Sequence, residues 1–183
     1  MKLHHHFRIN PFTDRQIAMT GWVVLIASCL SSCGVYSFKD VSVQPPNAKT
    51  IHIGFIENKA RYVNPQLSPQ LTDQLKQKIG SRIGKLSQVP TADADFDVTA
   101  YVTGYDPSTS GVSGQVASTN RLTVTVHIDF KNRLDDKRSF SADVSRNFDY
   151  TASLSLSQAE GALLPTIVSN VTDEMFNRIF SNW

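Results

Sequence analysis

Residues 51–55 are the first part of the chain in which apolar and polar positions alternate. Ile51, Ile53 and Phe55 alternate with His52 and Gly54. A period of two places successive side chains on opposite faces, which is typical of a β-strand. The sequence therefore predicts a strand that begins near residue 50.

The next segment has a helical period. An apolar residue recurs at almost every fourth position from residue 67 to residue 86: Leu67, Leu71, Leu75, Ile79, Ile83 and Leu86. This spacing predicts an amphipathic helix with one face toward a core. Ser68 and Pro69 predict its start, as N-cap and first helical residue. Gly80 and Gly84 would let the helix approach a sheet closely.

Alternation returns in three later segments, residues 96–105, 122–130 and 140–150, of which the middle one is the most regular. We predict three strands there. Residues 107–120 are rich in glycine and serine, and they predict a long loop that is mobile or functional. Residues 132–138 predict the turn between the last two strands.

The last segment is helical again. Its apolar stripe consists of Leu164, Val168, Val171, Met175 and Ile179. Ser157 and Glu160 have the spacing of a capping box, and Pro165 predicts a kink, or a short first turn followed by a restart. The order strand, helix, three strands, helix is typical of an α+β two-layer sandwich. We expect a four-stranded sheet covered on one face by two helices.

The beginning of the chain has a different pattern. Residues 17–30 carry no charge, and Lys2, Arg8 and Arg15 precede them. A basic segment followed by about 14 uncharged residues is typical of an export signal, because a membrane-spanning helix needs about 20. This pattern therefore predicts that the protein is exported.

Both cysteines stand at the end of this run. "LSSC", residues 30–33, resembles the box of bacterial lipoprotein signals, in which an aliphatic and two small residues precede the acylated cysteine. "IASC", residues 26–29, fits nearly as well. We favour Cys33 over Cys29, because Leu30 suits the first position and the small Gly34 follows. An ordinary secretory leader with incidental cysteines is the alternative.

These patterns divide the chain into three parts. We expect residues 1–32 to be a signal peptide that is removed, residues 33–49 to be a lipidated N-terminus and connector, and residues 50–183 to form the domain. The resemblance to lipoprotein signals implies a covalent diacylglycerol and an N-acyl chain on Cys33, and we expect no other cofactor. Because both cysteines precede the domain, it folds without a disulfide, which its length permits.

Charge limits the function classes. Residues 34–183 carry 15 basic and 15 acidic side chains. A neutral domain lacks the positive footprint that binding to duplex nucleic acid requires, so we expect no nucleic-acid partner.

Candidate catalytic residues are few. His52 and His127 are the histidines that follow the leader. His127 and Asp129, two apart on a predicted strand, share a face; they either orient an imidazole for catalysis or belong to a solvated surface. The sequence has no phosphate-binding glycine loop and no paired metal-ligand spacing. We therefore expect neither an enzyme nor a metal site.

Basic residues gather near the predicted central hairpin: Arg121, Lys131, Arg133, Lys137 and Arg138. Placed at one end of that hairpin, they would hold an anionic lipid through charge-assisted hydrogen bonds. A soluble charged turn is the alternative interpretation.

In order, several segments resemble the LptE family of lipopolysaccharide-assembly lipoproteins: "GVYSF", "IHIGFIEN", "LSPQLTDQLKQKI", "VTGYD", "LTVTVHIDFKN" and "MFNRIFSNW". The resemblance covers residues 33–183. It implies a small sheet covered by two helices, lipid-anchored to the periplasmic face of the outer membrane of Gram-negative bacteria. It also implies a place inside the β-barrel LptD, where the protein supports barrel assembly and lipopolysaccharide delivery to the cell surface.

The family contacts lipopolysaccharide through basic residues on loops at one end of the sheet. By residue type, the resemblance implies Lys131, Arg133, Lys137 and Arg138 as the contacts here. A periplasmic lipoprotein module that regulates a cell-wall synthase or a secretion complex is the alternative function.

Overall fold

The computed structural model describes residues 47–114 and 116–181. The predicted signal peptide (residues 1–32), Cys29, Cys33 and most of the predicted connector lie outside the described residues.

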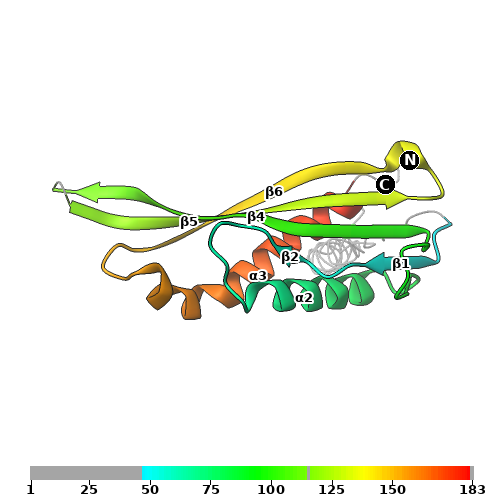
Figure 1. Cartoon of the computed structure of the whole chain (residues 1–183), viewed down its shortest axis with the longest axis horizontal. Helices are drawn as coiled ribbons and strands as arrows, with labels where there is room; N and C mark the ends of the chain where they lie inside the picture. Colours follow the sequence, from blue (N-terminus) through cyan, green and yellow to red (C-terminus); the bar gives the residue numbers. More distant parts are fainter. Residues whose placement is uncertain (1–46, 115, 182–183) are drawn as a thin grey trace, which may run out of the picture. The chain divides into compact units, whose positions relative to one another are not determined.

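The described residues form one mixed sheet and two long helices (Figure 1). The strands are β1 (Thr50–Ile53), β2 (Glu57–Asn58), β3 (Ser87–Gln88), β4 (Phe96–Ser113), β5 (Val116–Asn132) and β6 (Phe140–Thr151). The helices are α2 (Leu67–Arg82), α3 (Leu156–Phe180) and a short 3₁₀ helix, η1 (Asp136–Arg138).

The sheet has six strands, and its order is β3–β1–β4–β5–β6 with β2 also paired to β4. β1 runs parallel to β3 and β4, and β2 runs parallel to β4. β4 and β6 are both antiparallel to β5. The α+β class with two helices is confirmed, but the prediction of four strands is wrong. β2 and β3 have two residues each, which is too short for an alternating pattern to show.

Both helices pack on the same face of the sheet, and α2 and α3 contact each other (Figure 1). The predicted helical stripes point into the core: Leu67, Leu71, Leu75, Ile79, Leu164, Val168, Val171, Met175 and Ile179 are all buried. From the sheet, Val98, Val126 and Ile128 meet them. No helix among the described residues is long and apolar enough to cross a membrane.

The start of α2 differs from its prediction. The N-cap position is Gln66, without a side-chain cap, and Ser68 Oγ is buried with no hydrogen-bond partner in the part of the chain that the structure describes. Asn64 Oδ1 instead accepts a hydrogen bond from the Gln66 amide at 2.9 Å. The helix begins earlier because Leu67 already belongs to the buried stripe. Gly84 has no atom within 4 Å of an added Cβ, so it serves no close approach.

The start of α3 also differs. Ser155 and Gln158 form the capping box, two residues before the predicted pair Ser157 and Glu160. Pro165 lies inside α3, which continues through it from Leu156 to Phe180, so the predicted restart is wrong. Burial of the apolar stripe against the sheet outweighs the hydrogen bond that a proline lacks.

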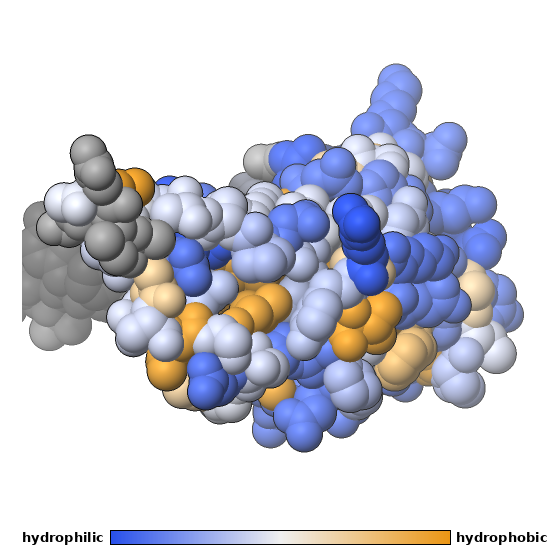
Figure 2. Space-filling model, turned by 60° about the vertical axis from the view of Figure 1, so that its left-hand side comes forward, coloured by the Kyte–Doolittle hydropathy of each residue, from blue (hydrophilic) through white to orange (hydrophobic). Residues whose placement is uncertain are grey.

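The predicted loop 107–120 is wrong: β4 and β5 pair through this stretch and form a long hairpin. Figure 1 shows this two-stranded ribbon extending past the end of β6. The pairing of β4 with β5 has three register shifts, one next to Gly104 and two next to Gly111. A Cβ at either glycine would lie 3.2 Å from the Cβ of a threonine on β5, which explains why glycine stands there. Figure 2, turned toward this side, shows apolar residues in separate small patches among hydrophilic ones.

Candidate anion-binding site

The turn between β5 and β6 is held by its own polar side chains. Asn132 is buried, and its Oδ1 accepts hydrogen bonds from the amides of Leu134 at 2.9 Å and Asp135 at 3.0 Å. Asp135 in turn caps η1 by accepting from the Lys137 amide at 3.3 Å. Such local bonds fix a turn without help from a core. They place Lys137 and Arg138 at defined positions.

A cavity of about 290 Å³ opens beside this turn. Its lining residues come from β5, η1, β6 and α3: Phe130, Lys137, Arg138, Ser139, Phe140, Arg178 and Ile179. Three of them are cations, and three are apolar. The cavity therefore combines positive charge with an apolar wall.

Arg178 is held at the cavity by an aromatic ring. Its guanidinium carbon lies 5.0 Å from the ring centre of Phe140, which is a cation–π distance. The rings of Phe140 and Phe130 are 5.4 Å apart. Arg138 Nε lies 3.3 Å from Asp135 Oδ2, whereas Lys137 has no carboxylate within 4.0 Å among the described residues. Positive charge therefore remains available to an anion.

The four predicted lipopolysaccharide contacts do not all lie at this cavity. Lys137 and Arg138 line the cavity, but Lys131 and Arg133 do not. Arg133 Nη2 donates to the carbonyl of Ala92 at 2.8 Å. Lys131 follows Phe130, and because side chains alternate along a strand, it points to the opposite face. Arg178 belongs to the last turn of α3 and is far from the others in sequence, so no local pattern indicated it.

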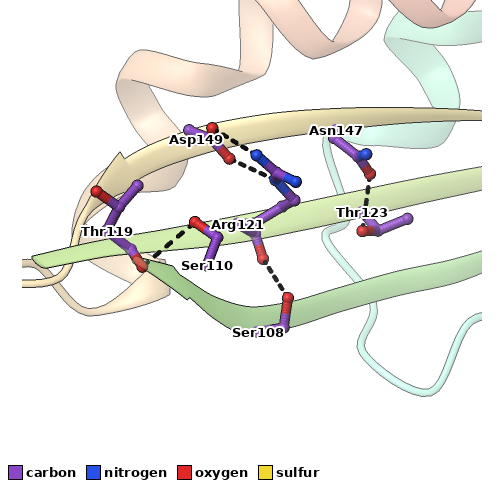
Figure 3. Close-up of polar contacts among 7 residues, drawn as sticks. All are labelled: Ser108, Ser110, Thr119, Arg121, Thr123, Asn147 and Asp149. Carbon is purple, nitrogen blue, oxygen red and sulfur yellow. Dashed lines mark hydrogen bonds and ion pairs between the residues drawn. The ribbon is translucent and has the colours of Figure 1, made fainter. Parts of the chain in front are cut away.

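Arg121 does not join this group, and the prediction that it clusters with the other four is wrong. It lies near the hairpin half of β5, opposite Ser108, whereas Lys131 lies opposite Asp97. In Figure 3 its guanidinium points to Asp149 on β6, with Nε–Oδ1 at 2.7 Å and Nη2–Oδ2 at 2.8 Å. This paired hydrogen bond lowers the pKa of Asp149 and raises that of Arg121.

The face of the sheet away from the helices carries further pairs of this kind. Thr123 Oγ1 donates to Asn147 Oδ1 at 2.9 Å (Figure 3). Ser108 donates to the carbonyl of Arg121 at 3.5 Å, and Ser110 donates to that of Thr119 at 3.4 Å. These bonds join the neighbouring strands to one another.

His127 belongs to the same face. Its Nδ1 lies 2.6 Å from Asp143 Oδ1, and its Nε2 lies 2.8 Å from Ser141 Oγ and 3.4 Å from Asp129 Oδ1. As predicted, His127 and Asp129 share a face. The hydrogen bond with Asp143 raises the pKa of His127, and Asp129 acts in the same direction.

Ser141, His127 and Asp143 follow the order of a nucleophile, a base and an acid. An acyl-transfer site also needs donors aimed at the oxyanion. The amides of a strand point within the sheet plane, whereas these side chains stand above it. The arrangement is better explained as a cross-strand network. Among residues 47–114 and 116–181, no group of His, Cys, Asp and Glu side chains could hold a metal ion.

The sequence model of the LptE family, described as lipopolysaccharide-assembly, matches residues 48–179. The chain belongs to the LptE family. The matched residues include the β5–β6 turn, the cavity beside it and Arg178. The match confirms the resemblance to the LptE family that the sequence segments show.

Several solved structures are similar to this LptE-family chain. A minor lipoprotein from Acinetobacter baumannii is 18% identical, with a TM-score of 0.47 over 74% of this chain and 94% of that one. An uncharacterized lipoprotein B from Nitrosomonas europaea is 9% identical, with a TM-score of 0.49 over 76% and 86%. A rare lipoprotein B from Shewanella oneidensis is 11% identical, with a TM-score of 0.46 over 72% and 91%. Among curated proteins, no significant match exists. At these scores the structural similarities add no functional argument.

Proposed function

We propose that this protein is an outer-membrane lipoprotein that sits inside an LptD-type β-barrel, supports assembly of that barrel and assists delivery of lipopolysaccharide to the cell surface. Membership of a lipopolysaccharide-assembly family supports the general role. The barrel, the membrane and the direct contact with the lipid are parts of the proposal.

The proposed contact with lipopolysaccharide is supported by the cavity between the β5–β6 turn and α3. Lipopolysaccharide carries phosphate groups beside acyl chains. Lys137, Arg138 and Arg178 would bind a phosphate through charge-assisted hydrogen bonds, and Arg offers two parallel donors to it. Phe130 and Phe140 would contact an acyl chain. The domain needs no net positive charge for this, because the three cations converge on one cavity.

The proposed lipid contact is tested by measuring how strongly the protein binds to immobilised lipopolysaccharide. Replacing Lys137 and Arg178 by Gln removes two cavity cations, and we expect binding to weaken about a hundredfold or more, since each charged hydrogen bond contributes on the order of 1.5–3 kcal/mol. The double variant Lys131→Gln and Arg82→Gln is the matched control, because it also removes one Lys and one Arg, both of them exposed and outside the cavity. Equal losses in both variants would show a nonspecific effect of charge and would contradict the site.

The partner is tested by purification in mild detergent. We expect a large outer-membrane β-barrel to co-purify with the protein. Recovery of a cell-wall synthase or a secretion pore instead, or of no barrel at all, would refute the LptD part of the proposal.

The anchor is a separate part of the proposal. We propose that Cys33 carries diacylglycerol and an N-acyl chain, which together hold a protein stably in a membrane. Mass spectrometry of the mature N-terminus tests this: Cys33→Ala should abolish acylation, and Cys29→Ala should not. Acyl groups found on Cys29 would overturn the assignment.

A further inference from the structure

A second cavity, of about 510 Å³, lies where β1 ends. Its walls come from β1 and the loop after it, from α2, and from β3 and the residues that follow, and they include His52, Phe55, Lys76, Gln88 and Pro90. It shares no lining residue with the cavity beside the β5–β6 turn. β1 and β3 are parallel, and the carboxyl ends of parallel strands are a common position for ligand sites.

His52 is fixed in orientation by the neighbouring strand. Its Nδ1 lies 2.7 Å from Asp97 Oδ1 on β4, and the two side chains are only 18% and 16% exposed. Because a carboxylate can only accept, Nδ1 carries the proton in this contact. Nε2 has no hydrogen-bond partner among the described residues. It is available to accept from a ligand, or to donate to one when the imidazole is charged.

Lys76 supplies a cation that the described residues do not neutralise. Its backbone carbonyl accepts from Gln88 Nε2 at 2.7 Å, which joins α2 to β3 at the cavity. Its ammonium has no carboxylate within 4.0 Å in the part of the chain that the structure describes. Lys78 on the same helix differs, because it pairs with Asp173 of α3. An unpaired cation and an oriented imidazole on the wall of one cavity are suited to an acidic group.

The same cavity has an apolar side. Phe55 follows β1 and is 59% exposed, which is high for a phenylalanine. Pro90 lies on the wall as well. A cavity that has both an exposed aromatic ring and an unpaired cation on its wall matches a molecule that joins an acidic group to a short apolar chain.

We propose that this cavity binds a small amphipathic anion, a phosphate or a carboxylate attached to an alkyl chain. Lys76 and His52 hold the acidic group, and Phe55 and Pro90 contact the chain. This site goes beyond the proposed contact with lipopolysaccharide, because it uses different residues on the opposite edge of the sheet.

The test uses the full chain in nanodiscs of zwitterionic lipid, with ¹³C-labelled histidine followed by NMR. The probes are hexyl phosphate, hexanoate, inorganic phosphate and hexanol. We expect hexyl phosphate or hexanoate to shift the His52 signal in a saturable way, while His127 on the open sheet face stays unchanged. The tighter of these two probes identifies the acidic group. Inorganic phosphate should bind about tenfold more weakly, because it lacks the apolar contact with Phe55 and Pro90.

Two variants distinguish this site from the first cavity. Lys76→Gln should raise the dissociation constant of the tighter probe about tenfold, because it removes a charged hydrogen bond. Lys137→Gln should leave it unchanged. Unaltered affinity in the Lys76 variant, an equal shift with hexanol, or equal shifts at His52 and His127 would each overturn the proposal. None of these results depends on whether lipopolysaccharide binds beside the β5–β6 turn.

Discussion

Two buried threonines, one on each helix, give a matched test of what a buried hydroxyl contributes when it has hydrogen-bond partners and when it has none. Thr72 on α2 is 3% exposed, and its Oγ1 accepts from the Ile56 amide at 3.0 Å and donates to the Ser68 carbonyl at 2.8 Å. Thr172 on α3 is 1% exposed, and its Oγ1 has no hydrogen-bond partner among the described residues. The same substitution by valine therefore removes a used hydroxyl in one case and an unused one in the other.

The magnitudes follow from what each valine leaves behind. Thr72→Val leaves the Ile56 amide buried and without a partner, at a cost of about 1–3 kcal/mol. Thr172→Val removes a buried hydroxyl that gains nothing from a partner, so we expect no loss, or a gain of up to about 1 kcal/mol. The helix propensities of Thr and Val are similar and cancel in the comparison. The two variants should therefore differ by about 2 kcal/mol.

Urea unfolding of the full chain, followed by circular dichroism, measures this difference as a change in midpoint at constant slope. Thr72→Ser is the control: it keeps the hydroxyl and loses one methyl group, so it should be less harmful than Thr72→Val. The reasoning is refuted if Thr72→Val is no more destabilising than Thr172→Val, or if the serine variant is the worst of the three.

Two further predictions concern the sheet and the helices. Asp143→Asn should lower the pKa of His127 toward 6.5 in an NMR titration, and an unaltered pKa in this variant would contradict the prediction. In the unchanged protein the charged imidazole contributes stability below pH 6.5, and that contribution is lost as the pH rises through the raised pKa. Gly104→Ala should destabilise the protein by about 1–3 kcal/mol, because its Cβ would lie 3.2 Å from the Cβ of Thr125 on the paired strand. Gly161→Ala in α3 meets no atom within 4 Å and should stabilise it by about 0.5–1 kcal/mol; equal urea midpoints would be the contrary result.

Much of the fold could be predicted from the sequence where a period extends over several turns or pairs. The alternation of residues 122–130 matches β5, and the apolar stripes of α2 and α3 match their buried faces. The paired stretch 107–120 could not be predicted, because glycine and serine are typical of loops. There the pairing depends on the partner strand and on hydroxyl groups that donate to its carbonyls, such as that of Ser110.

The candidate site was predictable only in part, for a geometric reason. Closeness in sequence placed Lys131 and Arg133 with Lys137 and Arg138. Side-chain direction separates them: Lys131 leaves β5 on the face opposite Phe130, and Arg133 is bonded to the Ala92 carbonyl. Arg178 reaches the cavity because α3 packs across the sheet, and no signal within its own segment indicates that contact.

The unequal distribution of irregularity between the strands has an evolutionary consequence. The register shifts lie in the pairing of β4 with β5, whereas β5 and β6 pair without interruption from Thr119–Thr151 to Phe130–Phe140. A one-residue slip in that uninterrupted ladder would turn every side chain to the other face. Insertions and deletions should therefore accumulate in β4 and at the hairpin tip. The end that carries the cationic cavity is thereby protected from changes in the length of the ribbon.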